Sequence, residues 1–538
     1  MINGAGCWDA SLQCDMAQRI IGGRERSVFI GMRPSLYHLL LDTAGRQPNS
    51  IAIVDDQGRT TSYGRLMRCV DDFAAYLETV AGVRHGGRVG LLMYADLEFV
   101  VALFAISKIG AVCVPIPTKY RKPEVVSLMR AADLSAIVAG EEFERWAPAF
   151  PLAAPRVVWA HGVKAGYGFE ASLGLGCRNH GLGCLEDPAI MMFTSGTTSA
   201  AKGVILRNYN VEHAVMVYQR LMGTTARDRC LIPIPIYHVT GLVALLVQFV
   251  FVGATVYLHR LFNARRVLEC VRDQRITYLH GSPTSFAELL SLRTDFPDLP
   301  SVRVMLSGSS YEPVSAMRAF HSWMPAATFK VVYGMTETSS PALLFPGDAP
   351  TSIYAGAAGK PVLGVDAKIV DEDGAEVPVG ATGELMLSGT CVTEGYYHHD
   401  TPDITADGWL CTGDMAYAND EGMVWVVDRK KDMINRGGEK VWCSGLEEVL
   451  CEIDGISEAC ATGIPDDLYG EVPVAAVVRA SGSRIVEDEV RRDLESRVAH
   501  FEIPTHVIFV DTIPQTRGEK PDRTAVREAV LDSIRKRK

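Results

Sequence analysis

The sequence lacks several features that would assign a protein to a class at once. Its 13 cysteines run from Cys7 to Cys460 without a single C-x-x-C pair, which gives no support to a zinc ribbon or a disulfide framework. Basic residues are the minority, because 53 Lys and Arg stand against 64 Asp and Glu and leave a formal charge of −11. Nucleic acid is therefore not expected as a partner, since phosphate contacts need a basic face.

Targeting and membrane signals are also missing. The N-terminus carries Asp9 and Asp15 and has no basic start before an apolar run, unlike a signal peptide. Residues 239–258 are uncharged over a length that could cross a bilayer, but Gly241 and Gly253 interrupt them and their end is typical of a β-strand. We expect a buried helix followed by a strand, no transmembrane segment and a cytoplasmic location.

What is present is an ordinary globular composition, with 48% hydrophobic and 22% charged residues. Helical and strand patterns alternate over most of the length, which predicts an α/β fold. From about residue 432 the pattern becomes that of a small α+β unit, whose first helix is expected to open with a capping box from Ser444 to Glu447. A boundary near 428–431 therefore separates a large domain from a small one of roughly a hundred residues.

The sharpest local signal lies at 191–203, which reads Met-Met-Phe-Thr-Ser-Gly-Thr-Thr-Ser-Ala-Ala-Lys-Gly. An apolar strand leads into several hydroxyl side chains and one lysine, and such a loop offers the donors and the cation that a polyphosphate needs. It is not a Walker A loop, because no Gly directly precedes Lys202. The alternative is a Ser/Thr-rich surface turn.

Four further motifs follow in order. They are Val-Val-Tyr-Gly-Met-Thr-Glu at 331–337, Gly-Trp-Leu-Cys-Thr-Gly-Asp at 408–414, Val-Asp-Arg-Lys-Lys-Asp at 427–432 and Pro-Gln-Thr-Arg-Gly-Glu-Lys at 514–520. With the 191–203 loop, this set resembles the adenylate-forming (AMP-binding) superfamily, which includes acyl-CoA and aryl-CoA ligases. The resemblance covers about 35–523. It implies that a carboxylate attacks the α-phosphate of ATP, and that a thiol then attacks the acyl carbon of the resulting acyl-adenylate.

The resemblance implies which residues bind the nucleotide. The β- and γ-phosphates are expected at Thr194, Ser195, Gly196, Thr197, Thr198 and Lys202. The adenine and the ribose are expected at Ser309, Tyr333, Gly334, Asp414 and Arg429.

The resemblance also implies the catalytic groups, which are Thr336, His238 and Lys520. Thr336 would contact the α-phosphate, and Lys520 would bridge it to the carboxylate and stabilise the charge of the transition state. Glu337 would ligate Mg²⁺, a hard cation that prefers carboxylate oxygen. ATP, Mg²⁺ and coenzyme A are the expected cofactors.

The family's domain arrangement implies an N-terminal extension at 1–34, a large multi-subdomain ATP- and acyl-binding domain at 35–428, a hinge at 429–431 and a small mobile α+β domain at 432–538. The small domain is expected to turn about Lys431, presenting Lys520 for the first step and the loop with Gly437, Gly438 and Lys440 for the second. Glycines would let a narrow pantetheine thiol pass close to the backbone. The alternative is that they are only turn glycines.

The acyl pocket is expected at His238, Ser282, Gly308 and Gly334. His238 stands where amino-acid-activating members carry an Asp, which favours a fatty or aromatic acid. Gly334 stands where acetate-specific members carry a bulky Trp, which argues against acetate. Medium-chain and aryl acids are not distinguished.

Three departures from the family pattern leave alternatives open. Ser199 replaces a usual Gly, Ala201 a usual Pro, and Glu519 the Gly before the catalytic lysine. A carboxylate beside Lys520 could compete for its charge. The leading hypothesis is an acid–CoA ligase. The alternatives are a ligase that loads the phosphopantetheine of a separate carrier protein, and a nucleotide-binding protein that has lost its chemistry.

Overall fold

The computed structural model describes residues 1–153, 156–160, 182–194, 202–398, 403–515 and 521–537. The chain forms two compact units, one from Met1–Ala367 and Leu387–Leu410, the other from Lys368–Met386 and Cys411–Lys538. The predicted hinge, 429–431, lies inside the second unit, at the turn that follows β23 (Val424–Arg429). The predicted domain boundaries and the hinge stay predictions.

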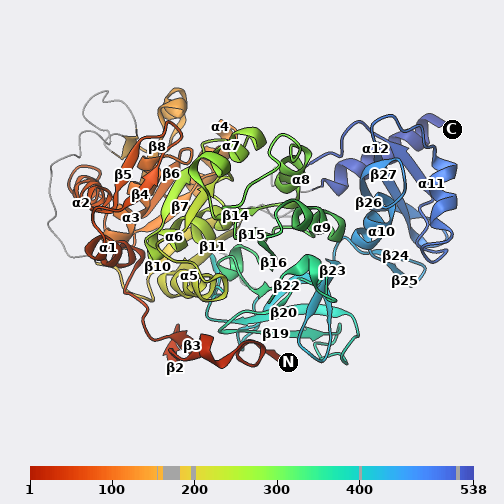
Figure 1. Cartoon of the computed structure of the whole chain (residues 1–538), viewed down its shortest axis with the longest axis horizontal. Coiled ribbons are helices and arrows are strands. Elements are labelled where there is room, and N and C mark those ends of the chain that lie inside the picture. The colour runs from red at the N-terminus through yellow and green to blue at the C-terminus, as the bar shows by residue number, and fades with distance from the viewer. Residues whose placement is uncertain (154–155, 161–181, 195–201, 399–402, 516–520, 538) are drawn as a thin grey trace. The chain divides into compact units, whose positions relative to one another are not determined.

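The first unit contains a seven-stranded sheet with the order β21-β11-β10-β7-β6-β8-β9 (Figure 1). The strands from β10 to β9 run parallel, and β7 and β8 are buried along their whole length. Strands of a parallel sheet are covered on both faces, which explains the short apolar runs in the sequence. The strands are β21 (Tyr396–Tyr397), β11 (Lys202–Arg207), β10 (Pro188–Thr194), β7 (Val112–Pro115), β6 (Arg88–Leu92), β8 (Ala136–Ala139) and β9 (Val157–Trp159).

A nine-stranded sheet completes the core of this unit, with the order β18-β17-β16-β15-β14-β12-β13-β4-β5. Its inner strands, from β16 to β4, are parallel, so their carboxyl ends meet along one edge. The strands are β18 (Lys360–Pro361), β17 (Leu343–Leu344), β16 (Thr328–Tyr333), β15 (Val304–Ser307), β14 (Tyr278–Gly281), β12 (Arg229–Ile232), β13 (Thr255–Leu258), β4 (Ile51–Val54) and β5 (Thr60–Ser62).

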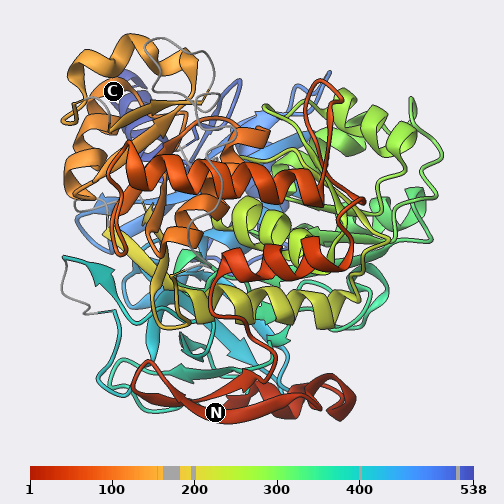
Figure 2. The same cartoon turned by 90° about the vertical axis from the view of Figure 1, so that its left-hand side faces the viewer.

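Helices cover these sheets, and α1, α2 and α3 pack on one another (Figure 2). The helices of the first unit are α1 (Leu36–Arg46), α2 (Tyr63–Thr79), α3 (Leu97–Ile109), α4 (Lys122–Ala131), η3 (Glu141–Ala149), α5 (Asn208–Met222), η5 (Thr240–Val247), α6 (Gln248–Val252), α7 (Ala264–Gln274), α8 (Pro283–Ser291), α9 (Val314–Trp323), η6 (Thr336–Thr338) and η7 (Ala349–Thr351).

The uncharged stretch 239–258 folds as predicted, with a buried helical segment (η5, then α6) followed by β13. The first part is π-helical, which the sequence pattern did not indicate. No helix among the described residues is long and apolar enough to cross a membrane. The cytoplasmic location stays a prediction.

The first 34 residues belong to the first unit. They comprise the short β1 (Ile2–Asn3), two 3-10 turns, η1 (Gly4–Cys7) and η2 (Ala10–Gln13), and a hairpin of β2 (Met16–Ile21) with β3 (Arg24–Phe29). Strand β1 pairs with β19 (Val365–Val370).

The second unit contains the small α+β domain predicted from the sequence. A five-stranded sheet orders four of its strands β25-β24-β27-β26, and β28 pairs with β27 outside this order. The elements are β20 (Gly383–Gly389), shared with the first unit, β22 (Leu410–Ala418), whose first residue belongs to the first unit, β23, β24 (Ile434–Arg436), β25 (Glu439–Val441), α10 (Cys443–Cys451), β26 (Ile456–Asp466), β27 (Gly470–Arg479), α11 (Glu487–Leu494), β28 (His506–Phe509) and α12 (Arg523–Arg537).

The predicted capping box of α10 is wrong. The helix begins at Cys443 after Trp442, and no side chain caps it. Glu447 instead accepts hydrogen bonds from Arg523 and from the Ala461 amide, 2.7 Å away. A half-buried guanidinium competes successfully for the carboxylate, because a charged pair forms the stronger hydrogen bond.

Candidate functional site

The predicted phosphate loop connects two paired strands. Thr194 ends β10 and Lys202 begins β11, and the two residues are register partners in the antiparallel pair. The loop is therefore closed at its base by the β10–β11 ladder. Ser195, Gly196, Thr197 and Thr198 lie outside the described residues, as do Ser199 and Ala201.

The predicted metal ligand lies at the carboxyl end of β16. Tyr333 ends this strand, and Thr336 and Glu337 lie in the 3-10 turn η6, which begins three residues later. The two residues after this turn, Ser339 and Ser340, have positive φ values of 56° and 100°. Non-glycine residues rarely adopt this conformation, and such outliers gather at functional sites.

Gly334 has a structural reason in addition to the expected one. A Cβ at this position would lie 1.5 Å from the Ser340 carbonyl oxygen, so the missing side chain makes room for the turn. A bulky residue at 334 would displace the turn that carries Glu337. Its place in the acyl pocket stays a prediction.

Glu337 and Lys202 meet around one tyrosine. The Tyr396 hydroxyl donates to Glu337 Oε1 over 3.3 Å, and Lys202 Nζ lies 5.1 Å from the centre of the Tyr396 ring. Lys202 also forms a 2.9 Å ion pair with Asp403. Tyr396 and Asp403 were missed by the sequence analysis, because neither lies within a recognised motif.

Burial raises the pKa of Glu337, and nearby Asp403 adds to this, whereas hydrogen bonds and Lys202 oppose it. A cation would relieve that cost. No group of three or more His, Cys, Asp or Glu side chains that could hold a metal occurs among the described residues. Mg²⁺ usually binds through one or two carboxylates and the oxygens of substrate phosphates, so a single carboxylate such as Glu337 is compatible with the predicted metal role, which stays a prediction.

The turn predicted to hold the adenine contains a further non-glycine residue with positive φ, Ser309, with φ 76°. Before it, a Cβ on Gly308 would lie 2.9 Å from Val332 Cγ1. Behind the turn, the Ser307 hydroxyl donates to Glu312, which is 2% exposed. Burial raises the pKa of Glu312 to about 7. Glu312 is a further residue that sequence reasoning missed.

The predicted acyl residues have identifiable structural roles. His238 is exposed, 4.7 Å from the Tyr237 ring, and its carbonyl accepts the Leu242 amide at the start of η5. The Ser282 hydroxyl caps α8 by accepting the Ser285 amide. His280, two residues earlier, is buried, and desolvation lowers its pKa to about 3, which keeps its ring neutral.

In the second unit, the two predicted ribose residues lie together. Asp414 on β22 and Arg429 on β23 are register partners, with Arg429 Nε 3.6 Å from Asp414 Oδ1. A carboxylate and a guanidinium on neighbouring strands place an acceptor beside donors, which would suit two adjacent hydroxyls. The contact with the ribose stays a prediction.

The loop predicted for the second step is a tight hairpin between β24 and β25. Gly437 and Gly438 have φ values of 61° and 97°, as both centres of a type I′ turn require. Lys440 lies 3.8 Å from Glu372. The turn explanation for these glycines is thus sufficient, and contact with a thiol stays a prediction.

Lys520 lies outside the described residues, but the base of its loop is defined. Gln515 and Pro521 form a β-bridge, and the Asp522 amide donates to the Pro514 carbonyl over 2.8 Å. Arg523, whose pKa is raised by Glu447 despite its burial, anchors the following helix.

Comparison with known proteins gives two family matches. The model described as "AMP-binding enzyme" matches residues 40–397, and the model described as "AMP-binding enzyme C-terminal domain" matches 445–520. The indoleacetate–CoA ligase of Aromatoleum aromaticum is 31% identical over 505 residues, which are 90% of this chain and 96% of the relative. A feruloyl-CoA synthase of an Amycolatopsis species is 33% identical over 469 residues, covering 86% and 92%.

Solved structures agree with these matches. ATP-bound MatB from Rhodopseudomonas palustris has a TM-score of 0.84 and 26% identity, covering 93% of this chain and 99% of its own. The o-succinylbenzoate coenzyme A synthetase of Bacillus subtilis, in complex with ATP and magnesium, has a TM-score of 0.80 and 25% identity, covering 91% and 99%. The matched models and relatives span both predicted domains. The chain therefore belongs to the AMP-binding, adenylate-forming enzyme family and is of the acyl- and aryl-CoA ligase type, which confirms the family and the mixed α/β fold predicted from its motifs.

Proposed function

We propose that this protein joins an aromatic carboxylic acid to coenzyme A in an ATP- and Mg²⁺-dependent reaction through an acyl-adenylate. The observation that carries this proposal is the meeting of Lys202 and Glu337 around Tyr396. The lysine supplies a cation for the terminal phosphates, and the carboxylate supplies the metal ligand. When bound, Mg²⁺ would neutralise phosphate charge as the carboxylate oxygen approaches the α-phosphate.

Two observations support an aromatic rather than an aliphatic acid. The relatives above are named for indoleacetate and ferulate. The predicted acyl residue His238 lies beside the Tyr237 ring, and a neighbouring ring favours stacking on an aryl group. The carrier-protein alternative gains no support from these relatives, which are named for coenzyme A.

The substrate class is tested by carboxylate-dependent pyrophosphate release. The panel contains indoleacetate, ferulate and benzoate, with octanoate, acetate and phenylalanine as the competing classes. We expect at least one aromatic acid to exceed octanoate in kcat/KM by roughly tenfold or more, a difference of ~1.4 kcal/mol in transition-state binding. Preference for octanoate would contradict the aromatic assignment, and no release with any acid would contradict the ligase activity.

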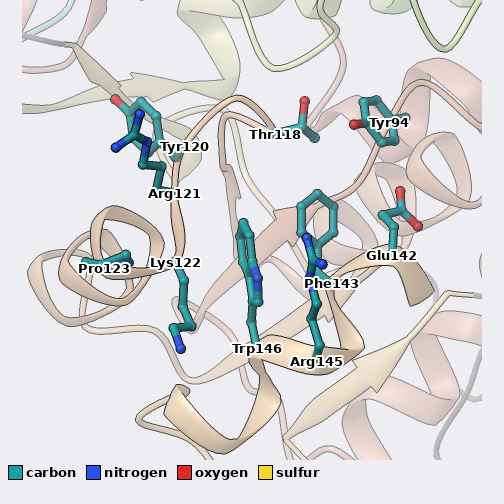
Figure 3. A pocket seen from close by; sticks show the side chains of 10 residues that line it. All are labelled: Tyr94, Thr118, Tyr120, Arg121, Lys122, Pro123, Glu142, Phe143, Arg145 and Trp146. Atoms are coloured by element: carbon teal, nitrogen blue, oxygen red, sulfur yellow. The ribbon is translucent and has the colours of Figure 1, made fainter.

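A pocket of about 490 Å³ supports coenzyme A as the acceptor. It lies beyond the carboxyl ends of β6, β7 and β8. In the sheet, β7 and β8 lie on opposite sides of β6, so the strand order reverses at this point. Ligands of open α/β sheets bind at such reversals of strand order. Figure 3 shows the rings of Phe143 and Trp146 projecting from η3. The centres of these two rings lie 5.0 Å apart.

The charges of this pocket suit a nucleotide with several phosphates. Arg121, Lys122 and Arg145 line it, and its carboxylate, Glu142, is paired with Arg260 at 3.0 Å. We propose that the aromatic rings receive the adenine of coenzyme A and that the basic residues receive its phosphates.

The pocket is tested with two acceptors. The double variant Lys122→Ala, Arg145→Ala should raise the KM for coenzyme A by roughly ten- to a hundredfold, since hydrogen bonds to charged groups contribute about 1.5–3 kcal/mol. Its KM for free pantetheine, which has the thiol but no nucleotide, should not change. Arg130→Ala, an exposed change on α4, is the control. Equal losses with both acceptors would remove the pocket from coenzyme A binding.

A further inference from the structure

The hairpin at the N-terminus touches the segment that supports the metal site. Its two-residue turn, Gly22 and Gly23, has φ values of 60° and 72°. A Cβ on Gly22 would lie 1.7 Å from Glu394 Oε1 and 2.8 Å from the Tyr209 hydroxyl. The backbone of the turn is therefore so close to the Glu394 carboxylate that only glycine fits at position 22.

Glu394 is held by three side chains, one from β3 and two from the junction of β11 and α5. Arg26 of β3 pairs with its Oε1 at 3.3 Å, and the Tyr209 hydroxyl donates to the same oxygen over 2.7 Å. Arg207 pairs with Oε2 at 3.0 Å. The Arg26 side chain is 8% exposed, so water screens this ion pair little.

The hairpin also forms hydrogen bonds with the residues that precede Glu394 in the chain. Arg26 donates to the Gly389 carbonyl, and the Thr390 hydroxyl donates to the Ser27 carbonyl over 2.8 Å. We refer to residues 389–397 as the supporting segment. Its first two residues form hydrogen bonds with β3. Its last two residues are β21, which pairs with β11.

The supporting segment holds Glu337 at two points. The Thr393 amide donates to the Glu337 carbonyl over 2.7 Å, and the Tyr396 hydroxyl donates to its Oε1 over 3.3 Å. Glu394 lies between these two contacts. A shift of Glu394 would therefore move both groups that orient the carboxylate.

We propose that Arg26 is a positioning residue for the adenylation step: by fixing Glu394, it orients Glu337 toward the metal bound with ATP. This inference rests on the proposed function in one respect, the role of Glu337 as the metal ligand. Residues that support a ligand of this kind typically change metal affinity by ten- to a hundredfold when lost. Because Arg26 acts through Glu394, the lower end is expected.

The test is the affinity of Mn²⁺ in the presence of ATP, measured by electron paramagnetic resonance, which needs neither an acid nor turnover. Arg26→Met should weaken it by roughly tenfold. Arg26→Lys, which keeps the charge, should restore most of it. Arg19→Met is the matched control, because Arg19 is the register partner of Arg26 on β2 and is exposed.

Kinetics provide the second readout. Arg26→Met should raise the KM for MgATP, while thioester formation from chemically made acyl-adenylate stays unchanged. Wild-type Mn²⁺ affinity in folded Arg26→Met would overturn the proposal, as would an equal loss in Arg19→Met. If Arg26→Met does not fold, Glu394→Gln is tested in its place, because the amide keeps the shape of the side chain and weakens both arginine pairs. Unchanged Mn²⁺ affinity in Glu394→Gln would also overturn the proposal. Failure of the wild type to release pyrophosphate with any acid would instead refute the proposed function.

Discussion

Lys520→Ala should lose acyl-adenylate formation by roughly a hundred- to a thousandfold, as removal of one transition-state donor does. The ammonium is expected to meet the negative charge that passes between the carboxylate and the α-phosphate. The same variant, supplied with acyl-adenylate and coenzyme A, should form thioester at close to the wild-type rate. Pyrophosphate release and thioester formation, measured separately, check the two halves.

The reverse pattern is expected when the predicted hinge is stiffened. Lys431→Pro fixes φ in the turn between β23 and β24, which should slow thioester formation and leave adenylation available. Equal loss of both half-reactions in Lys520→Ala would contradict the alternation of the small domain. Lys520 would then be a general binding residue.

Glu337→Gln should reduce adenylation by roughly a hundredfold or more, since the amide keeps the shape of the side chain but not the charge that holds the metal. The apparent affinity for Mg²⁺ in the presence of ATP should fall with it. Near-normal pyrophosphate release at saturating Mg²⁺ would remove Glu337 from this role. Glu288→Gln, the same change at an exposed position of α8, is the control.

The same variant should make the ligand-free protein more stable at neutral pH. Burial raises the pKa of Glu337 in the folded state, so the folded protein holds its proton more tightly than the unfolded chain does. This carboxyl therefore costs stability as pH rises above its unfolded pKa, and glutamine avoids the cost. Thermal unfolding of Glu337→Gln and wild type should differ near pH 7 and converge near pH 4. A lower melting temperature of the variant at pH 7 would contradict this reasoning.

Much of the fold could be predicted because its signals are local. The predicted charged helix after residue 486 is α11, and the predicted strand near 506–510 is β28. Both could be predicted because the periodicity of their hydrophobic residues is a property of a short contiguous segment. The start of α10 could not be predicted in the same way. Glu447 fits a capping box by spacing, but Arg523, 76 residues away, takes its carboxylate. Arg523 can reach Glu447 only after β26 and α12 have packed together.

The family and its ligase chemistry could be inferred from the sequence, because five motifs, each a contiguous run of residues, resemble those of the adenylate-forming superfamily. How the site is supported depends on tertiary contacts. The partners of Glu337 come from residues 393 and 396, and the Glu394 carboxylate between them is held by Arg26 and Arg207, far apart in the chain. The physical reason is that strand pairing and register select which distant side chains meet, and neither is encoded in the local pattern around any one residue.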